Sequence, residues 1–206
     1  DGRLLMAHTD DRAVLVTRLP GEVEDRDLSW LDASWVADLS RDGQLLLFTE
    51  TGQGGGSEAA AYLRRTDGSP AVRLGAGQAY ALSPDTQWAA CSSPASAVGT
   101  PSPYMELVPT GAGNPRRLPD HGLAYLGARW LPDGNRIAVS AIEPGQRTRV
   151  YLLALDEDAP TPLTPEGVLS WVVSPDGSTI AATGSSPTIR LYPVDGTAPR
   201  EIPGMT

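Results

Sequence analysis

The sequence predicts an all-β protein built from about five repeats of four short strands, and two observations support that prediction. Helical periodicity is nearly absent, whereas 22 glycines and 19 prolines separate short apolar runs, as many strands joined by turns require. In addition, an aspartate-centred turn followed by an apolar strand recurs every 41 to 48 residues. A period in the forties without helices is typical of the blades of a β-propeller. The anchoring aspartates are Asp1, Asp42, Asp85, Asp133 and Asp176.

The parts of each repeat follow in the same order. The aspartate turn joins an inner strand to a second strand, and a hairpin then supplies the third and fourth strands. Inner strands are expected before Asp42 and within 78–83, 122–131 and 168–174. The hairpins end at Leu28, Leu74, Leu118, Leu163 and Ile202. One propeller domain over 1–206 is therefore divided into the approximate repeats 1–28, 29–74, 75–118, 119–163 and 164–202.

The recurring aspartates are assigned to folding rather than to chemistry, because an Asp-Gly turn caps its own backbone and lets the chain reverse. In the third repeat Thr86 stands where the other turns have glycine. That replacement costs little in a type I turn, and it strains the backbone if the position needs a positive φ.

The two ends of the chain suggest an incomplete ring. The first repeat begins at its turn, Asp1-Gly2, so the first blade is expected to lack its inner strand, and 203–206 is too short to supply one. The chain is then either a piece of a longer propeller, or five blades that close by themselves or against another chain. Because an open strand edge offers unpaired backbone groups, we expect self-association into a dimer or a larger oligomer.

The turn motif also carries a family resemblance. The pattern (W)xSPDGxxIA, matched best at 130–138 and 174–181, resembles the TolB-type, WD-repeat-like propeller blade over nearly the whole chain. The stretch 27–85 is similar to the propeller region that follows the kinase domain in some bacterial serine/threonine protein kinases. These resemblances imply a non-catalytic sensing or protein-binding module from a bacterium, such as the extracytoplasmic part of a membrane-anchored kinase. The matching residues are all turn and strand residues, so no functional residue of TolB carries over.

Composition excludes several classes of function. The chain has 25 acidic and 16 basic residues, a net charge of -9, which disfavours nucleic acid and anionic membranes as partners. All of the basic residues are arginine, so Schiff-base lysines and nucleotide-binding lysines are excluded. No apolar run reaches the roughly 18 residues of a membrane span. The single Cys91 is expected to be a buried hydrophobic residue, and no GxSxG nucleophile motif is present.

Propeller topology predicts where chemistry could lie. Strands alternate in direction, so the loops between blades and those between second and third strands share the face with the channel mouth. His8, Asp10, Asp120 and His121 fall in such loops, and these groups suit Zn²⁺, Ca²⁺ or Mn²⁺. His8, Asp120 and His121 would be the catalytic residues and His8, Asp10 and His121 the metal ligands. The alternative is that these are solvated loop residues, since no HxH or HExxH spacing occurs. Further acids on this face are Asp11, Glu22, Glu24, Asp25, Glu50, Glu58 and Glu143.

Tryptophans and acids near the mouth suggest a binding surface. Trp30 and Trp35 lie on the approach to the second repeat, where they could line a site together with Glu50 and Glu143. Three other tryptophans are expected to pack between blades, and the loops 51–57 and 92–103 are expected to be mobile. We therefore expect a propeller that binds a protein segment or small ligand at its mouth. The alternative is a metal-dependent hydrolase of esters, lactones or phosphotriesters at the same mouth. The three tryptophans expected to pack between blades are Trp88, Trp130 and Trp171.

Overall fold

The computed structural model describes residues 13–18, 21, 23–52, 58–157, 159–186 and 188–202. In this part of the chain, one two-stranded sheet and four four-stranded sheets follow one another, and every sheet is an antiparallel meander. The predicted all-β fold with four-stranded blades in series is confirmed. No helix in these residues is long and apolar enough to cross a membrane.

Each sheet is one blade, named by its order in the chain. The hairpin of blade 1 is β1 (Val16–Thr17) and β2 (Arg26–Asp27). Blade 2 contains β3 (Ala33–Leu39), β4 (Leu45–Thr51), β5 (Ala60–Arg65) and β6 (Val72–Ala76). Blade 3 contains β7 (Ala79–Leu82), β8 (Trp88–Ser92), β9 (Met105–Pro109) and β10 (Arg116–Arg117). Blade 4 contains β11 (Ala124–Trp130), β12 (Arg136–Ile142), β13 (Arg149–Ala154) and β14 (Thr161–Pro162). Blade 5 contains β15 (Ser170–Val173), β16 (Thr179–Thr183), β17 (Arg190–Pro193) and β18 (Arg200–Glu201).

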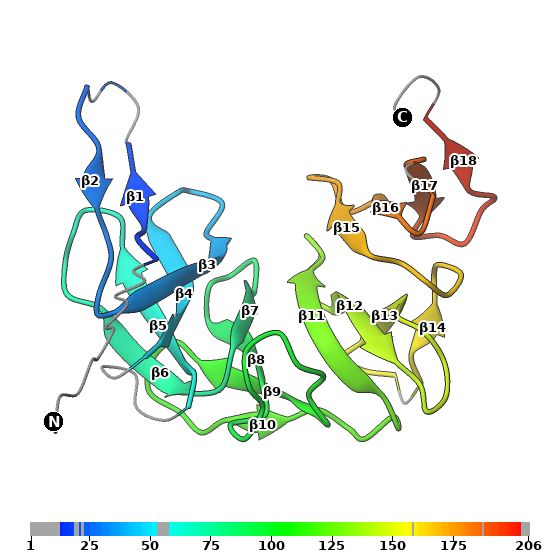
Figure 1. Cartoon of the computed structure of the whole chain (residues 1–206), viewed down its shortest axis with the longest axis horizontal. Helices are drawn as coiled ribbons and strands as arrows, with labels where there is room; N and C mark the ends of the chain where they lie inside the picture. Colours follow the sequence, from blue (N-terminus) through cyan, green and yellow to red (C-terminus); the bar gives the residue numbers. More distant parts are fainter. Residues whose placement is uncertain are drawn as a thin grey trace, which may run out of the picture.

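The blades follow an arc, with the first strands of blades 2 to 5 along its inner side (Figure 1). The arc is open between the hairpin β1–β2 and blade 5 (Figure 1). The part of the first repeat that precedes Ala13 lies outside the described residues, and so does the expected absence of its inner strand.

An apolar cluster fills the space between each pair of adjacent blades. Leu15 and Leu28 of blade 1 pack with Phe48 of blade 2, and Leu131 of blade 4 packs with Ile180 of blade 5. Two more clusters join blade 2 to blade 3 and blade 3 to blade 4. The second strands of blades 2, 3 and 4 are therefore buried on both faces, which explains why they read as nearly continuous apolar runs. The predicted packing of Trp88, Trp130 and Trp171 between blades is confirmed, since all three pack against these clusters.

Side chains along β4 alternate between the two neighbouring blades. Leu46 and Phe48 belong to the cluster shared with blade 1, whereas Leu47 belongs to the cluster shared with blade 3. Thr49 faces blade 3 as well, because its hydroxyl accepts the backbone N–H of Ala79 at 3.0 Å. By the same alternation, Glu50 lies on the side of blade 1.

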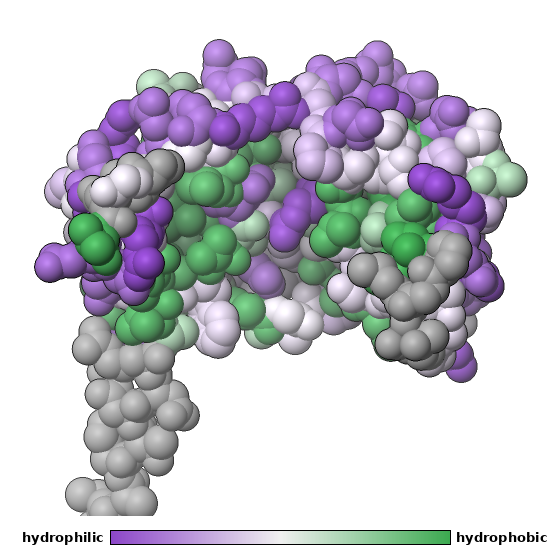
Figure 2. Space-filling model, turned by 90° about the horizontal axis from the view of Figure 1, so that it is seen from above, coloured by the Kyte–Doolittle hydropathy of each residue, from purple (hydrophilic) through white to green (hydrophobic). Residues whose placement is uncertain are grey.

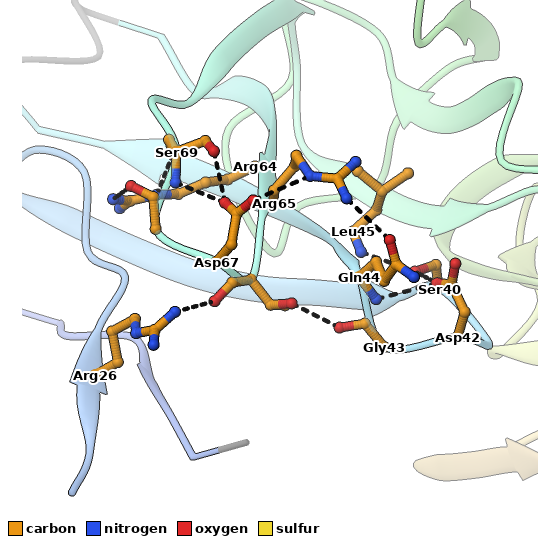
Figure 3. A network of polar contacts seen from close by, with 12 residues as sticks. Arg26, Ser40, Asp42, Gly43, Gln44, Leu45, Arg64, Arg65, Asp67 and Ser69 are labelled. Carbon is orange, nitrogen blue, oxygen red and sulfur yellow. Dashed lines mark hydrogen bonds and ion pairs between the residues drawn. The ribbon is translucent and has the colours of Figure 1, made fainter. Parts of the chain in front are cut away.

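The aspartate turns are built as the sequence predicts. Asp42 accepts the Ser40 hydroxyl at 2.6 Å and the backbone N–H of Gln44 at 3.0 Å, and the Ser40 hydroxyl accepts the N–H of Leu45 at 2.8 Å (Figure 3). The hydroxyl bond and the N–H bond lower the pKa of Asp42. Asp176 makes the same set of bonds with Ser174 and Ser178, and its pKa falls to about 2. The structural role assigned to Asp42, Asp85, Asp133 and Asp176 is confirmed, and Asp1 lies outside the described residues.

Candidate functional site

A pocket of about 460 Å³ opens where the loop after β4 meets the loop after β8. These loops connect the second and third strands of blades 2 and 3, and propeller topology predicts that such loops lie on the face with the channel mouth. The pocket is lined by Trp35, Thr51, Gly52, Glu58 and Ala59 from blade 2 and by Pro94, Ala95, Ser96, Ala97 and Val98 from blade 3.

Trp35 is the large exposed side chain of this pocket. It lies on the inner strand β3 with 53% of its surface exposed. Its indole Nε1–H donates to the hydroxyl of Thr51 at 3.3 Å, and the register of β3 against β4 places both side chains on the blade 3 side of the sheet. The indole is therefore held at the pocket instead of turning freely in solvent.

Glu50 is fully buried at 0% exposure and supports the same segment from behind. Its Oε1 accepts the backbone N–H of Ala33 at 2.8 Å, and its Oε2 accepts the Ser34 hydroxyl at 2.6 Å. The Ser34 oxygen in turn accepts the backbone N–H of Trp30 at 3.1 Å. A buried carboxylate needs such donors to offset its desolvation. Glu50, predicted from sequence as a ligand-binding residue, therefore acts by positioning the segment from Trp30 to Trp35.

Trp30 lies apart from the pocket lining. The guanidinium of Arg64 sits 5.8 Å from its ring centroid and also donates to the carbonyl oxygen of Leu28 at 2.7 Å. The two tryptophans that the sequence places together at the mouth are thus in different surroundings. Trp30 packs under an arginine, and Trp35 lines the pocket.

The metal and acid candidates that the structure describes do not form a metal-binding group. Asp120 accepts the backbone N–H of Gly122 at 2.9 Å, and His121 lies half-buried beside it. Glu143 accepts the Tyr151 hydroxyl at 2.7 Å; burial of that phenol, together with this bond, raises the pKa of Tyr151 to about 12. Within the described ranges, no group of three or more His, Cys, Asp or Glu side chains could hold a metal ion. His8 and Asp10 lie outside the described residues, so the metal site stays a prediction.

Cys91 is buried in β8, as expected from the sequence. Burial raises the pKa of its thiol to about 12, so the thiolate needed for nucleophilic attack is scarce at neutral pH.

The wall formed by 94–98 is the part of the pocket that the sequence does not predict, because its composition indicates a mobile loop over 92–103. The structure anchors this loop instead. Ser102 exchanges two backbone hydrogen bonds of 2.7 Å with Tyr125 of blade 4, and its hydroxyl accepts the N–H of Ser93 at 2.8 Å. The signal available in the sequence was the run of serines, whose hydroxyls are buried along the loop. The glycine-rich segment 53–57 lies outside the described residues.

Comparisons with solved structures identify the architecture. TolB from Acinetobacter baumannii superposes with a TM-score of 0.65 at 19% identity, over 86% of this chain and 47% of that protein. A putative TolB from Agrobacterium tumefaciens gives a TM-score of 0.71 at 16% identity, over 92% of this chain and 73% of that protein. An oligogalacturonate lyase in complex with manganese gives 0.62 at 14% identity, over 87% of this chain and 56% of the lyase.

The chain thus spans about half the length of the Acinetobacter TolB. No protein-family model and no curated protein matches the sequence. At these identities the structural matches establish architecture alone. Together with the four-stranded antiparallel sheets in series, they show that the chain has the fold of TolB-like β-propellers.

Proposed function

We propose that the chain is a non-catalytic binding or sensing module that takes a protein segment or small ligand at the pocket of Trp35. The observation that carries this proposal is the exposed indole of Trp35, which a hydrogen bond to Thr51 holds at a concave site. Large aromatic side chains fixed in pockets are the groups that dominate binding energy at interfaces. A volume of about 460 Å³ is within the usual range for ligand sites.

The residues around the pocket support a binding role rather than a catalytic role. Glu58 is its one charged group among the lining residues that the structure describes, and these residues include no histidine or cysteine. The buried network of Glu50, Ser34 and Ala33 lies behind it and fixes the strand that carries Trp35. Preorganisation of this kind lowers the entropy lost on binding.

The test is a panel of peptides, Gly-Ser-Gly-Xaa-Gly-Ser-Gly with blocked ends, in which Xaa is Arg, Lys, citrulline, Leu or Glu. Binding is measured by titration against wild-type protein, Trp35→Ala and the matched control Trp30→Ala. We expect at least one peptide to bind and Trp35→Ala to weaken it by about 30-fold, since a hot-spot aromatic contributes about 2 kcal/mol. Trp30→Ala should leave the affinity within about threefold. Absence of any binding that depends on Trp35 would refute the proposal.

One finer assignment extends this proposal, and one alternative competes with it. The similarity of 27–85 to kinase-linked propellers supports a role as the sensor region of a bacterial serine/threonine kinase. The alternative, a metal-dependent hydrolase, rests on His121 and Asp120 with His8 and Asp10. Metal analysis of the purified protein and an ester, lactone and phosphotriester panel with and without chelator tests it. Chelator-sensitive turnover that is lost in His121→Ala would favour the hydrolase over the binding module.

We also propose that the ends of the arc take part in self-association. Val172 is 61% exposed on the side of blade 5 that faces away from blade 4, since its neighbours Trp171 and Val173 pack toward blade 4, and Leu169 just before β15 is 76% exposed. Val14 and Val16 are exposed on the side of blade 1 that faces away from blade 2. Figure 2 shows hydrophobic surface on both sides of the hollow at the opening of the arc. Apolar faces of this kind are typical of association sites.

A further inference from the structure

We propose that the pocket of Trp35 takes a cationic side chain, arginine, from a basic peptide segment. This inference rests on the proposed function and names the chemistry of its ligand. It follows from three features of the pocket wall, which are its charge, its apolar surface and its aromatic ring.

The charge of the wall is negative. Glu58 is the one ionisable side chain among the described lining residues. Asp32 adds a second carboxylate beside the wall, because a Cβ placed on Gly52 would lie 3.0 Å from the Asp32 Cβ and 3.3 Å from its Oδ2. No arginine lines the described part of the pocket, so an anionic ligand would meet repulsion without a compensating cation.

The wall from blade 3 is mostly apolar, and Ser96 is its one polar side chain among the described lining residues. Pro94, Ala95, Ala97 and Val98 come from the anchored loop of blade 3 and face a pocket that Glu58 borders from blade 2. A purely apolar ligand would desolvate the Glu58 carboxylate without giving it a donor, which is costly. An arginine side chain fits both walls, because its methylene stem packs on apolar surface while its head reaches the carboxylate.

The aromatic ring favours the same ligand. A guanidinium is attracted to the face of an indole and stacks on it as a plane. The chain itself places a guanidinium over an aromatic ring at two positions, Arg64 over the indole of Trp30 at 5.8 Å and Arg117 over the phenol of Tyr104 at 3.8 Å from the ring centroids. Trp35 is exposed at the pocket, where it can receive a guanidinium from another chain.

The net negative charge of the whole chain also favours a cationic ligand. A net charge of -9 attracts basic segments over long range and speeds their encounter at low salt. Attraction between exposed charges is screened by salt, so binding of a basic segment should weaken as ionic strength rises.

The deciding experiment compares arginine with citrulline, its neutral and nearly isosteric analogue, in the peptide panel above. We expect the arginine peptide to bind about tenfold more tightly than the citrulline peptide at 50 mM salt, and the glutamate peptide to bind most weakly. Glu58→Gln should reduce the preference for arginine to about twofold. Glu24→Gln makes the same change of charge outside this pocket and should keep the preference.

Equal affinity for arginine and citrulline, or a preference for the leucine or glutamate peptide that still depends on Trp35, would overturn this inference and leave the proposed function standing. Loss of the preference in Glu24→Gln as fully as in Glu58→Gln would also overturn it, because the attraction would then be diffuse. If no peptide binds in a way that depends on Trp35, the proposed function itself fails.

Discussion

The strain at a single residue distinguishes the third repeat from the others. Thr86 has a φ of 60° and is the one non-glycine residue with a positive φ among the described residues, whereas the matching Gly43, Gly134 and Gly177 have φ of 70°, 75° and 73°. A β-branched residue is disfavoured in this conformation. We therefore predict that Thr86→Gly raises the free energy of unfolding by about 1 kcal/mol, measured by urea denaturation.

The matched control is the reverse change in a neighbouring repeat. A Cβ at Gly134 would meet nothing within 4 Å, so Gly134→Thr tests the backbone conformation alone. It should lower the free energy of unfolding by about 1 kcal/mol. A neutral or destabilising Thr86→Gly would mean that the turn relaxes without cost.

The lowered pKa values of the turn aspartates predict how the stability of the fold depends on pH. The Ser174 hydroxyl and Ser178 lower the pKa of Asp176 to about 2, below the value of about 3.9 in unfolded chains. The stability from this carboxylate is fully present above about pH 4 and is lost as the pH falls toward 2. Ser174→Ala removes the largest cause of the lowered pKa. We predict that its loss of thermal stability relative to wild type is largest near pH 6 and shrinks toward pH 2.

Melting temperatures measured at half-unit steps of pH check this prediction. The difference between the two proteins should be the same at pH 6 and pH 7, where the carboxylate is ionised in both. A difference that stays constant from pH 7 down to pH 2 would show that the serine acts without Asp176, through its bond to the N–H of Thr179.

At the scale of strands, two acids at the two ends of one hairpin loop have opposite roles. Glu50 lies next to the last residue of β4 in a buried network, and Glu58 lies shortly before β5 at the exposed pocket. We predict that Glu50→Ala lowers the free energy of unfolding by about 2 to 3 kcal/mol, because the N–H of Ala33 and the hydroxyl of Ser34 lose their acceptor. Glu58→Ala should change it by less than about 0.5 kcal/mol. Equal effects in urea denaturation would contradict the positioning role of Glu50.

The same elements show what sequence could and could not predict. The blades were predictable because the aspartate turns and apolar strands are local signals that repeat in every blade. The role of Glu50 was not, since it depends on the register that places Ser34 opposite it. The wall at 94–98 depends on the pairing of Ser102 with Tyr125 in another blade, which no local pattern encodes. The place of Trp35 near the mouth could be predicted from the sequence, but the separation of Trp30 from the pocket could not.

At the scale of the whole molecule, the apolar ends of the arc predict assembly. We expect wild-type protein to sediment as a dimer or larger species at tens of micromolar. Val172→Glu, on the exposed side of blade 5, should shift it to monomer because a buried unpaired charge is costly. Val72→Glu places the same charge on the exposed β6 and should leave assembly unchanged. A strictly monomeric wild-type protein would contradict the self-association proposal.

The binding role of Trp35 is tested most directly by the indole N–H signals of the five tryptophans in a ¹H–¹⁵N spectrum, assigned with single Trp→Phe variants. The five side chains lie in different surroundings, so each signal reports on one place in the molecule. On addition of the arginine peptide, the signal of Trp35 should move in a saturable way while those of Trp88, Trp130 and Trp171 stay in place. An unmoved Trp35 signal at saturating peptide, or a saturable shift confined to the core tryptophans, would contradict the account.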